Sequence, residues 1–212
     1  WDQFCQLSQN ATFLHTRSFL NYHGNRFQDQ SLIIRDSGVL IGLFPAAVDP
    51  SNKRVIVSHP GATFGGVIHQ GRLTGSKMIE TLKEIINYYK KLGFSKILYK
   101  AVPHIYCTVP SQDDSYAMFR THAKRVRCDL SSCVDLQFQR KLNSRRRRGI
   151  QKSLAVLTIS NDNRYLDQLW PVLQDNLQRK HYAMPVHSLE EMKVLLTKFP
   201  KNIQLKVGLI DD

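Results

Sequence analysis

The chain has 212 residues, of which 42% are hydrophobic and 22% are charged, a composition typical of a folded globular protein and not of a disordered one. Lysine and arginine number 30 against 17 aspartate and glutamate residues, so the formal net charge is +13. No apolar run reaches the roughly 20 residues that a membrane-spanning helix needs, so we expect no membrane span.

The first 60 residues predict short helices followed by strands. Aromatic and leucine side chains along residues 4–20 favour one or two short helices with an aromatic inner face. Residues 32–34 and 39–44 are β-rich runs, and residues 36–38 between them have the composition of a hairpin turn. A second turn signal at 49–52 precedes another β-rich run, so we expect three successive strands in an antiparallel meander.

A glycine-rich loop at residues 59–66 is followed by the strongest helix signal in the chain. Apolar side chains at residues 78–89 recur with the 3.6-residue period of a helix. Thr74 or Ser76 is predicted to cap its start, and Gly93 is the residue type favoured just past a helix end. Residues 95–101 then predict a strand, so that strand, helix and strand form a crossover unit with a parallel pair.

The pattern of helices and strands then begins again after one more helix and strand. A helix at 111–123 and a weakly alternating strand at 127–138 are expected to complete the first half. The second half predicts, in order, a strand at 156–160, a helix at 165–181, a helix opened by a capping box at 188–191, and a strand at 203–210. This order indicates an α/β fold with a mixed sheet. The unpaired last strand favours completion by a second copy, a homodimer.

Seven of the 13 excess positive charges lie in residues 140–152, which contain no acidic residue. Clustered guanidinium groups bind phosphate oxygens, so Arg145 and Arg148 are candidates for contact with nucleic acid or with a cofactor's phosphates. A block of like charges is also typical of a solvated helix, which Ser144 would cap and whose Ile150 and Leu154 would face inward. The residues alone leave both interpretations open.

The four cysteines, Cys5, Cys107, Cys128 and Cys133, form no C-x-x-C pair and no disulfide-like framework. Free thiols at this density fit a reducing compartment, so we expect a cytoplasmic protein. The histidines show no metal-ligand spacing, and no serine, histidine and aspartate set can be defined. We therefore expect neither a metal site nor a catalytic triad.

Several segments from both halves of the chain together resemble one protein family. They are residues 13–15, 22–23, 26–27, 58–61, 64–66, 99–106, 145–152, 185–191 and 199–203. With the predicted order of elements, they make the chain similar to the Fem-like branch of the GNAT acyltransferase superfamily and to bacterial acetyltransferases of its double-domain type.

The resemblance implies a GNAT-like acyl-CoA N-acyltransferase fold, α/β with a mixed sheet. It divides the chain into a first unit at 1–139, a basic linker helix at 140–155 and a second unit at 156–212. Relatives continue beyond this pattern, so one complete unit and the first part of a second are expected here.

The resemblance also implies an activity. We expect first an N-acyltransferase that moves an acetyl or other acyl group from an acyl-CoA to an amine acceptor, although an incomplete second unit would leave the chain inactive. A Fem-like transferase would instead take its acyl group from aminoacyl-tRNA. A third alternative is a non-catalytic GNAT-like module that binds nucleic acid or an acidic partner through residues 145–148.

A site for the acyl-CoA phosphates is expected from the resemblance at Arg72, Gly75, Ser76 and Lys77. GNAT enzymes hold the pyrophosphate with a loop of the type Arg/Gln-x-x-Gly-x-Gly/Ala, and here Lys77 stands in place of the final Gly or Ala. Free amides at a helix start and flanking basic side chains favour phosphate. An ordinary exposed helix cap would have the same residues.

His181, Tyr182 and His187 are the candidate catalytic residues. They lie in or beside the connection between the two predicted helices of the second half, and polar side chains on loops often contact substrates. The alternative is structural, with His187 preceding a helix and Tyr182 packed on the core. Acyl transfer needs only a base for the attacking amine and a donor to the developing oxyanion, so the sequence does not identify the base.

Overall fold

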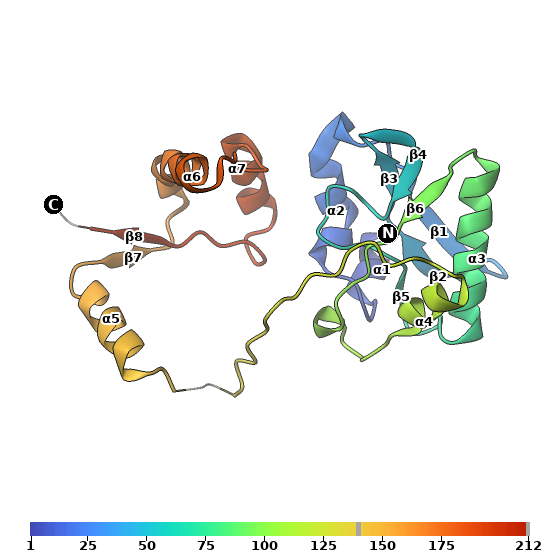
Figure 1. The fold of residues 1–212 in the computed structure, drawn as a ribbon, viewed down its shortest axis with the longest axis horizontal. Helices are drawn as coiled ribbons and strands as arrows, with labels where there is room; N and C mark the ends of the chain where they lie inside the picture. Colours follow the sequence, from blue (N-terminus) through green and yellow to red (C-terminus); the bar gives the residue numbers. More distant parts are fainter. Residues whose placement is uncertain (139–140, 211–212) are drawn as a thin grey trace. The chain divides into compact units, whose positions relative to one another are not determined.

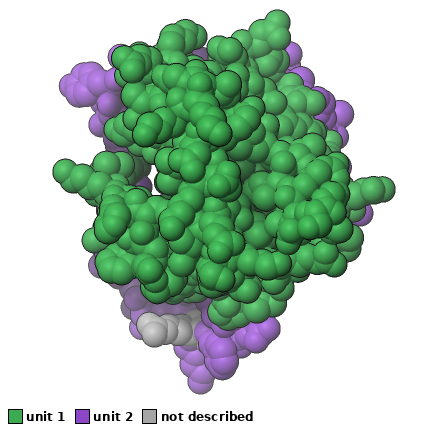
Figure 2. All heavy atoms as spheres, turned by 90° about the vertical axis from the view of Figure 1, so that its right-hand side faces the viewer, with its two compact units in different colours: residues 1–127 green, residues 128–212 purple. Residues whose placement is uncertain are grey.

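The computed structural model describes residues 1–138 and 141–210 and divides the chain into two compact units, residues 1–127 and 128–212 (Figure 1). Figure 2 colours the two units separately. Each unit has a buried apolar cluster made of its own residues. The predicted boundary at residues 139 and 140 lies outside the described residues, as do the last two residues of the predicted second unit.

Unit 1 begins with four short helical turns. They are α1 (Asp2–Gln6), η1 (Phe13–His15), α2 (Arg17–Leu20) and η2 (Asn21–Arg26). Threonine side chains cap two of them, because the hydroxyl oxygen of Thr12 accepts from the Leu14 amide in η1 and that of Thr16 accepts from the Phe19 amide in α2. Phe4 and Phe19 are buried, which confirms the prediction of short helices with an aromatic inner face.

The strands of unit 1 form two sheets of three strands each. In one sheet β1 (Leu32–Asp36) pairs antiparallel with β2 (Val39–Phe44), which pairs with β5 (Ile68–His69). In the other, β3 (Ala47–Asp49) pairs antiparallel with β4 (Asn52–Val57). The predicted hairpin and the predicted turn at 49–52 are therefore confirmed, but the single meander is wrong. Pro45 follows β2 directly and has no amide hydrogen to continue its ladder.

The predicted crossover unit is confirmed. The chain runs from β4 through α3 (Ser76–Lys91) to β6 (Lys96–Leu98), and β4 and β6 pair in parallel. Gly93, with φ of 86°, ends α3, and the amide of Phe94 donates to the carbonyl of Tyr89 at 3.0 Å. The carboxyl ends of two parallel strands therefore lie at one edge of this sheet.

The core of unit 1 lies on both faces of the strands. Phe44 on β2 packs in one cluster with Met78 and Leu82 from α3, and its neighbour Leu43 packs in another cluster with Phe4 from α1. Successive side chains of a strand point to opposite faces, so α3 and α1 cover opposite sides of β2 (Figure 1). The second helix expected after the crossover is α4 (Asp113–Arg120), which packs against α3.

The strand predicted at residues 127–138 is wrong. Residues 123–138 have no helix or strand, and apolar side chains along them are exposed, among them Leu130, Val134, Leu136 and Phe138. A strand is stabilised by the ladder of a neighbouring strand, and among the described residues none pairs with this segment. Weak alternation alone is not sufficient to form one.

The described residues of unit 2 form three α-helices, one 3-10 helix and one pair of strands that lie far apart in the sequence. Its elements are α5 (Ser144–Leu154), β7 (Thr158–Ser160), η4 (Asn163–Tyr165), α6 (Leu166–His181), α7 (Leu189–Lys198) and β8 (Val207–Leu209). Strands β7 and β8 pair antiparallel. Leu166 and Trp170 of α6 pack with Leu196 of α7 in the core. The predicted capping box is present, since Ser188 and Glu191 bond reciprocally.

In the described parts of the chain, no helix combines the length and the apolar character that crossing a membrane requires.

Candidate functional site

The start of α3 carries the residues predicted to hold a cofactor's phosphates. One backbone amide there, that of Gly75, binds a carboxylate of the chain itself. Gly75 is the N-cap, with φ of 54°, so neither Thr74 nor Ser76 caps this helix as predicted. The Gly75 amide donates to Oδ1 of Asp113 at 2.7 Å. The pKa of Asp113 is held below its usual range by the Ser111 hydroxyl and by the Gly75 amide, so this carboxylate is ionised at neutral pH.

The basic side chains of this loop line a shallow depression, and one of them is also paired. The depression has a volume of about 570 Å³. Its lining residues are Asp36, Ser37, Val39, Ile41, Arg72, Thr74 and Lys77. The Lys77 ammonium lies 3.2 Å from the Asp36 carboxylate, whereas Ser76 is exposed and does not line the depression. The structure therefore brings Arg72 and Lys77 together beside an acidic side chain.

The three candidate catalytic residues of unit 2 are not brought together. His181 ends α6, and Tyr182 follows it in a left-handed conformation with its side chain 88% exposed. His187 alone lines a depression of about 590 Å³ between α6 and α7, and its Nδ1 lies 3.9 Å from Oε2 of Glu191. The other lining residues are Trp170, Gln174, Met184, Pro185, Val186, Ser188, Leu189 and Glu191. His187 is thus the one member of the trio placed to contact a ligand here.

The start of α5 is a concentration of unmatched positive charge. Arg145 to Arg148 are its second to fifth residues and are exposed, and in the described parts of the chain none of them forms an ion pair. The Asn143 side chain caps the helix by accepting the Arg146 amide at 2.8 Å, so the cap is Asn143 and not Ser144 as predicted. Ile150 is 42% exposed and Leu154 59% exposed, so neither faces a core as predicted.

Cations in the first turn of a helix oppose its dipole, whose positive end lies there. Four arginines at this place therefore do not help the helix to form. A bound anion would offset both the dipole and the mutual repulsion of the guanidinium groups. Among the described residues the chain supplies no acidic group for this purpose, which makes the start of α5 the strongest candidate for contact with an external polyanion.

The carboxyl ends of β4 and β6 form a second candidate region, in unit 1. Ser58 follows β4, and its hydroxyl accepts the Lys100 amide at 2.7 Å, which joins the two strand ends. Tyr99 directly follows β6, and its hydroxyl accepts from the Val67 amide at 2.8 Å and donates to Asp114 at 3.1 Å. Burial raises the pKa of Tyr99 well above its usual value, so the phenol stays protonated. In α/β proteins the ends of parallel strands are a common place for ligand sites.

The glycine-rich loop at residues 59–66 covers these strand ends. Three of its carbonyl groups face basic side chains: Gly61 faces Nε2 of His23 at 3.1 Å, Gly65 faces Nε2 of His15 at 3.4 Å, and Ala62 accepts from Nζ of Lys100. A side chain at Gly61 would collide with His23, and one at Gly65 would collide with the Ser58 carbonyl. Glycine is therefore required at both positions for the loop to lie this close.

His59, the first residue of this loop, is visible in the sequence as a histidine that could line a cleft at the sheet's edge, but its conformation and its buried nitrogen are not. It has φ of 61°, its ring is only 4% exposed, and its Nδ1 has no hydrogen-bond partner among the described residues. The rings of His23 and Phe27 lie at 5.4 and 5.5 Å. Burial, and then the nearby His23, lower the pKa of His59 to about 4. The sequence shows only a histidine before Pro60, and nothing in it signals the left-handed backbone or the unpaired nitrogen.

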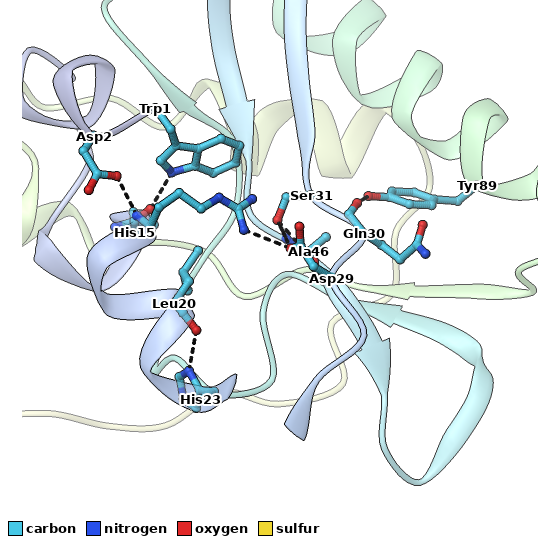
Figure 3. Close-up of polar contacts among 11 residues, drawn as sticks. Trp1, Asp2, His15, Leu20, His23, Asp29, Gln30, Ser31, Ala46 and Tyr89 are labelled. Carbon is cyan, nitrogen blue, oxygen red and sulfur yellow. Dashed lines mark hydrogen bonds and ion pairs between the residues drawn. The ribbon is translucent and has the colours of Figure 1, made fainter. Parts of the chain in front are cut away.

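A network of polar contacts holds the short helices against the segment that precedes β1 (Figure 3). The Arg17 guanidinium lies 4.1 Å from the centre of the Trp1 ring and 3.2 Å from Oδ1 of Asp29. The Asp2 carboxylate accepts the Arg17 amide at 2.6 Å, and Asp29 accepts the Ser31 hydroxyl at 2.6 Å. The network places the charges of Arg17 and Asp29 within electrostatic reach of His59.

Comparison of the chain with known proteins identifies its fold. No family model matches the chain, and no curated protein sequence matches it either. A solved structure, the crystal structure of FemX, is similar with a TM-score of 0.54 at 10% sequence identity. The similarity covers 99% of this chain and 56% of FemX, so the chain spans little more than half the length of that protein. The fold is Fem-like.

The Fem-like fold confirms the predicted fold class, a mixed α/β architecture of the GNAT-related type. It extends over both units, as the resemblance implied. At 10% identity the comparison concerns the fold alone. The acyl-CoA donor, the site residues and the domain boundaries drawn from the sequence stay predictions.

Proposed function

We propose that the chain carries out Fem-like acyl transfer with an aminoacyl-tRNA as donor. The amine of an acceptor attacks the ester carbonyl carbon of the aminoacyl group, an amide bond forms, and the bond to the ribose oxygen breaks. The amine releases one proton and the departing ribose oxygen takes one up. The observation that carries the proposal is the unmatched basic start of α5 in a chain whose Fem-like fold extends over both units.

RNA is the partner that this helix start fits best. A nucleic-acid backbone presents phosphates in series, and each arginine that contacts one releases condensed counterions. Arg145 to Arg148 and Lys152 provide five cations within 11 helical residues without an acidic neighbour in the helix. The guanidinium group also forks onto phosphate oxygens, which an ammonium group does not.

Acyl-CoA is the less favoured donor because its predicted phosphate site is already engaged. The Gly75 amide binds the Asp113 carboxylate and Lys77 is paired with Asp36, so a pyrophosphate would have to displace two anions of the chain itself. Lys77 also departs from the GNAT loop pattern, which has Gly or Ala at this position, and this too disfavours acyl-CoA as the donor. Arg72 is the one basic residue of that loop without an ion pair among the described residues.

The proposal is tested by RNA binding and by acyl transfer measured on the same preparations. Binding of fluorescent tRNA is followed by anisotropy at potassium chloride concentrations from about 50 to about 200 mM. For the wild-type chain we expect an affinity that falls steeply with salt, and for a variant with Arg145 to Arg148 changed to glutamine a log–log slope shallower by about 3 to 4 units. A variant with Arg72→Gln and Lys77→Gln is the matched control and should keep the wild-type slope.

Transfer is then measured with aminoacyl-tRNA carrying a radiolabelled amino acid and hydroxylamine as a small generic amine. The expected result is faster formation of the amino acid hydroxamate than in buffer, lost in the arginine variant. RNA binding without any acceleration would reject the transferase and leave a binding module. Stabilisation by coenzyme A that depends on Arg72 and Lys77, without RNA binding, would replace the proposed donor by acyl-CoA.

A further inference from the structure

His59 combines two unfavourable features at one residue. Its backbone adopts a left-handed conformation that costs a branched or bulky residue more than glycine, and its buried Nδ1 has no partner among the described residues. A glycine at this position would make the same turn without either penalty. The side chain is therefore not required by the turn, and its burial there calls for a partner that the chain does not supply.

His15 shows that this unit can bury a histidine without leaving a nitrogen unpaired. Its ring is 1% exposed, its Nδ1 accepts the Thr12 amide at 2.9 Å, and its Nε2 faces the Gly65 carbonyl at 3.4 Å. Both nitrogens thus have partners from the chain, and the ring ties η1 to the glycine-rich loop. Compared with His15, the unpaired nitrogen of His59 is a local property of the end of β4 and not a general feature of buried histidines in this unit.

The charged and titratable groups near enough to act on the pKa of His59 come from four different parts of unit 1. They are Arg17, His23, Asp29 and Lys100. Arg17 is paired with Asp29 at 3.2 Å. The Lys100 ammonium donates only to the neutral Ala62 carbonyl and forms no ion pair with the described residues. The surroundings of His59 therefore hold more positive than negative charge.

We propose that His59 and Lys100 anchor a subsite for an anionic oxygen, a carboxylate or a phosphate, which residues 59–66 cover in this structure. The Ala62 carbonyl oxygen now occupies the place beside Lys100 that an oxygen of the anion takes in the bound state. Opening of the loop releases Nζ of Lys100 and exposes Nδ1 of His59, and the anion then bonds to both.

The subsite is independent of the function proposed above, because it lies in unit 1 and uses no residue of α5. It also has its own pH dependence. An anion bonded to Nδ1 of His59 favours the protonated ring, so binding takes up a proton and becomes tighter as the pH falls, by up to about tenfold for each pH unit. A nitrogen that is merely capped by water would not give this pH dependence of anion binding.

The test uses the full chain with nitrogen-15 in its histidine rings. Sodium acetate and sodium phosphate are titrated in separate series at constant ionic strength, and the ring signals of His59 are assigned by their absence from a His59→Asn spectrum. We expect a saturable change at His59 but not at His15, and an acetate affinity that increases from pH 8 to pH 6. A response to acetate alone, to phosphate alone or to both identifies the chemistry of the anion and supports the subsite.

Lys100→Met removes the charge of the proposed anchor and keeps most of the side chain, while Lys77→Met is the matched control in the depression beside α3. The response of His59 should be lost in the first variant and kept in the second. The subsite is rejected if His59 does not respond to either anion, if the response survives Lys100→Met unchanged, or if it follows Lys77. Should His59→Asn fail to fold, His59→Gln takes its place in the assignment.

Discussion

The starts of α3 and α5 are both basic, but only one of them has its charge matched by the chain. At α3 the Gly75 amide holds the carboxylate of Asp113, and Lys77 holds that of Asp36. At α5 four arginines follow one another, and the described residues provide no carboxylate for any of them. A basic helix start is thus informative about an external anion only once the positions of the acidic side chains are known.

The largest effect that this comparison predicts is on RNA affinity. Changing Arg145 to Arg148 together to glutamine should weaken tRNA binding by roughly 10³-fold near 0.15 M salt, about 4 kcal/mol, because four phosphate contacts and their counterion release are lost. The stability of the chain should stay within about 0.5 kcal/mol, since these side chains are exposed. Anisotropy and urea unfolding measure the two quantities on the same samples. Equal losses from Arg72→Gln and Lys77→Gln would remove the distinction between the two helix starts.

The second effect is a loss of stability in acid that is confined to unit 1. Burial lowers the pKa of both His15 and His59 to about 4, against 6.5 for a free ring. Each therefore contributes stability that is complete above pH 6.5 and is lost as the pH falls towards 4, about 2 kcal/mol per ring at pH 5.

The two tryptophans allow this loss to be measured in each unit separately. Trp1 lies in unit 1 and Trp170 in unit 2, so Trp170→Phe leaves a reporter in unit 1 and Trp1→Phe leaves one in unit 2. Urea unfolding followed by fluorescence should show unit 1 losing roughly 4 kcal/mol between pH 7 and pH 5. Equal acid sensitivity of the Trp170 signal would show that His15 and His59 are not the cause.

A third prediction separates two buried histidines of the same unit. His15→Asn should destabilise the chain by about 2 to 4 kcal/mol, because it removes a packed ring and bonds to Thr12 and Gly65. His59→Asn should cost clearly less, because asparagine tolerates a left-handed backbone and no hydrogen bond of the ring is lost. Urea unfolding at pH 7.5 gives both values. A greater loss for His59→Asn would mean that its ring packing outweighs the strain.

The smallest effect tests whether the start of α3 can be made to resemble that of α5. Asp113→Asn removes the carboxylate that the Gly75 amide holds and should destabilise the chain by about 1 kcal/mol. It should also give coenzyme A or inorganic phosphate a measurable affinity for this loop, weakened again by Arg72→Gln. Thermal-shift titration detects both changes. No gain in phosphate binding would mean that the loop does not form an anion site even when the Asp113 carboxylate is absent.

The parts of the fold that sequence predicted well are those fixed by local pattern. The period of apolar residues over 78–89 and the position of Gly93 predict α3 closely, and Ser188 with Glu191 predicts the start of α7. The segment at 127–138 failed because a strand depends on a partner elsewhere in the chain, which a weak local alternation does not reveal. The meander failed because Pro45 separates strands that the local pattern joins.

The candidate site was less predictable, for a physical reason. The state of the α3 loop is decided by Asp113, which lies 38 residues after Gly75 and becomes its neighbour only when α4 packs on α3. The state of His59 depends on φ and on the absence of a partner, and neither is a property of residue type. Charge clusters such as the start of α5 are visible in sequence, whereas the groups that neutralise them are visible only in three dimensions.

The irregular, exposed stretch that follows α4 has a practical consequence for work with this protein. Lys124, Arg125 and Arg127 lie in it, next to exposed apolar side chains, so trypsin should cleave there before it reaches the packed helices. Because the apolar clusters of the two units share no residue, brief digestion should release fragments that each keep a core and one tryptophan. A fresh preparation therefore needs protease inhibitors, and a stored one is best judged by the appearance of those two fragments on a gel.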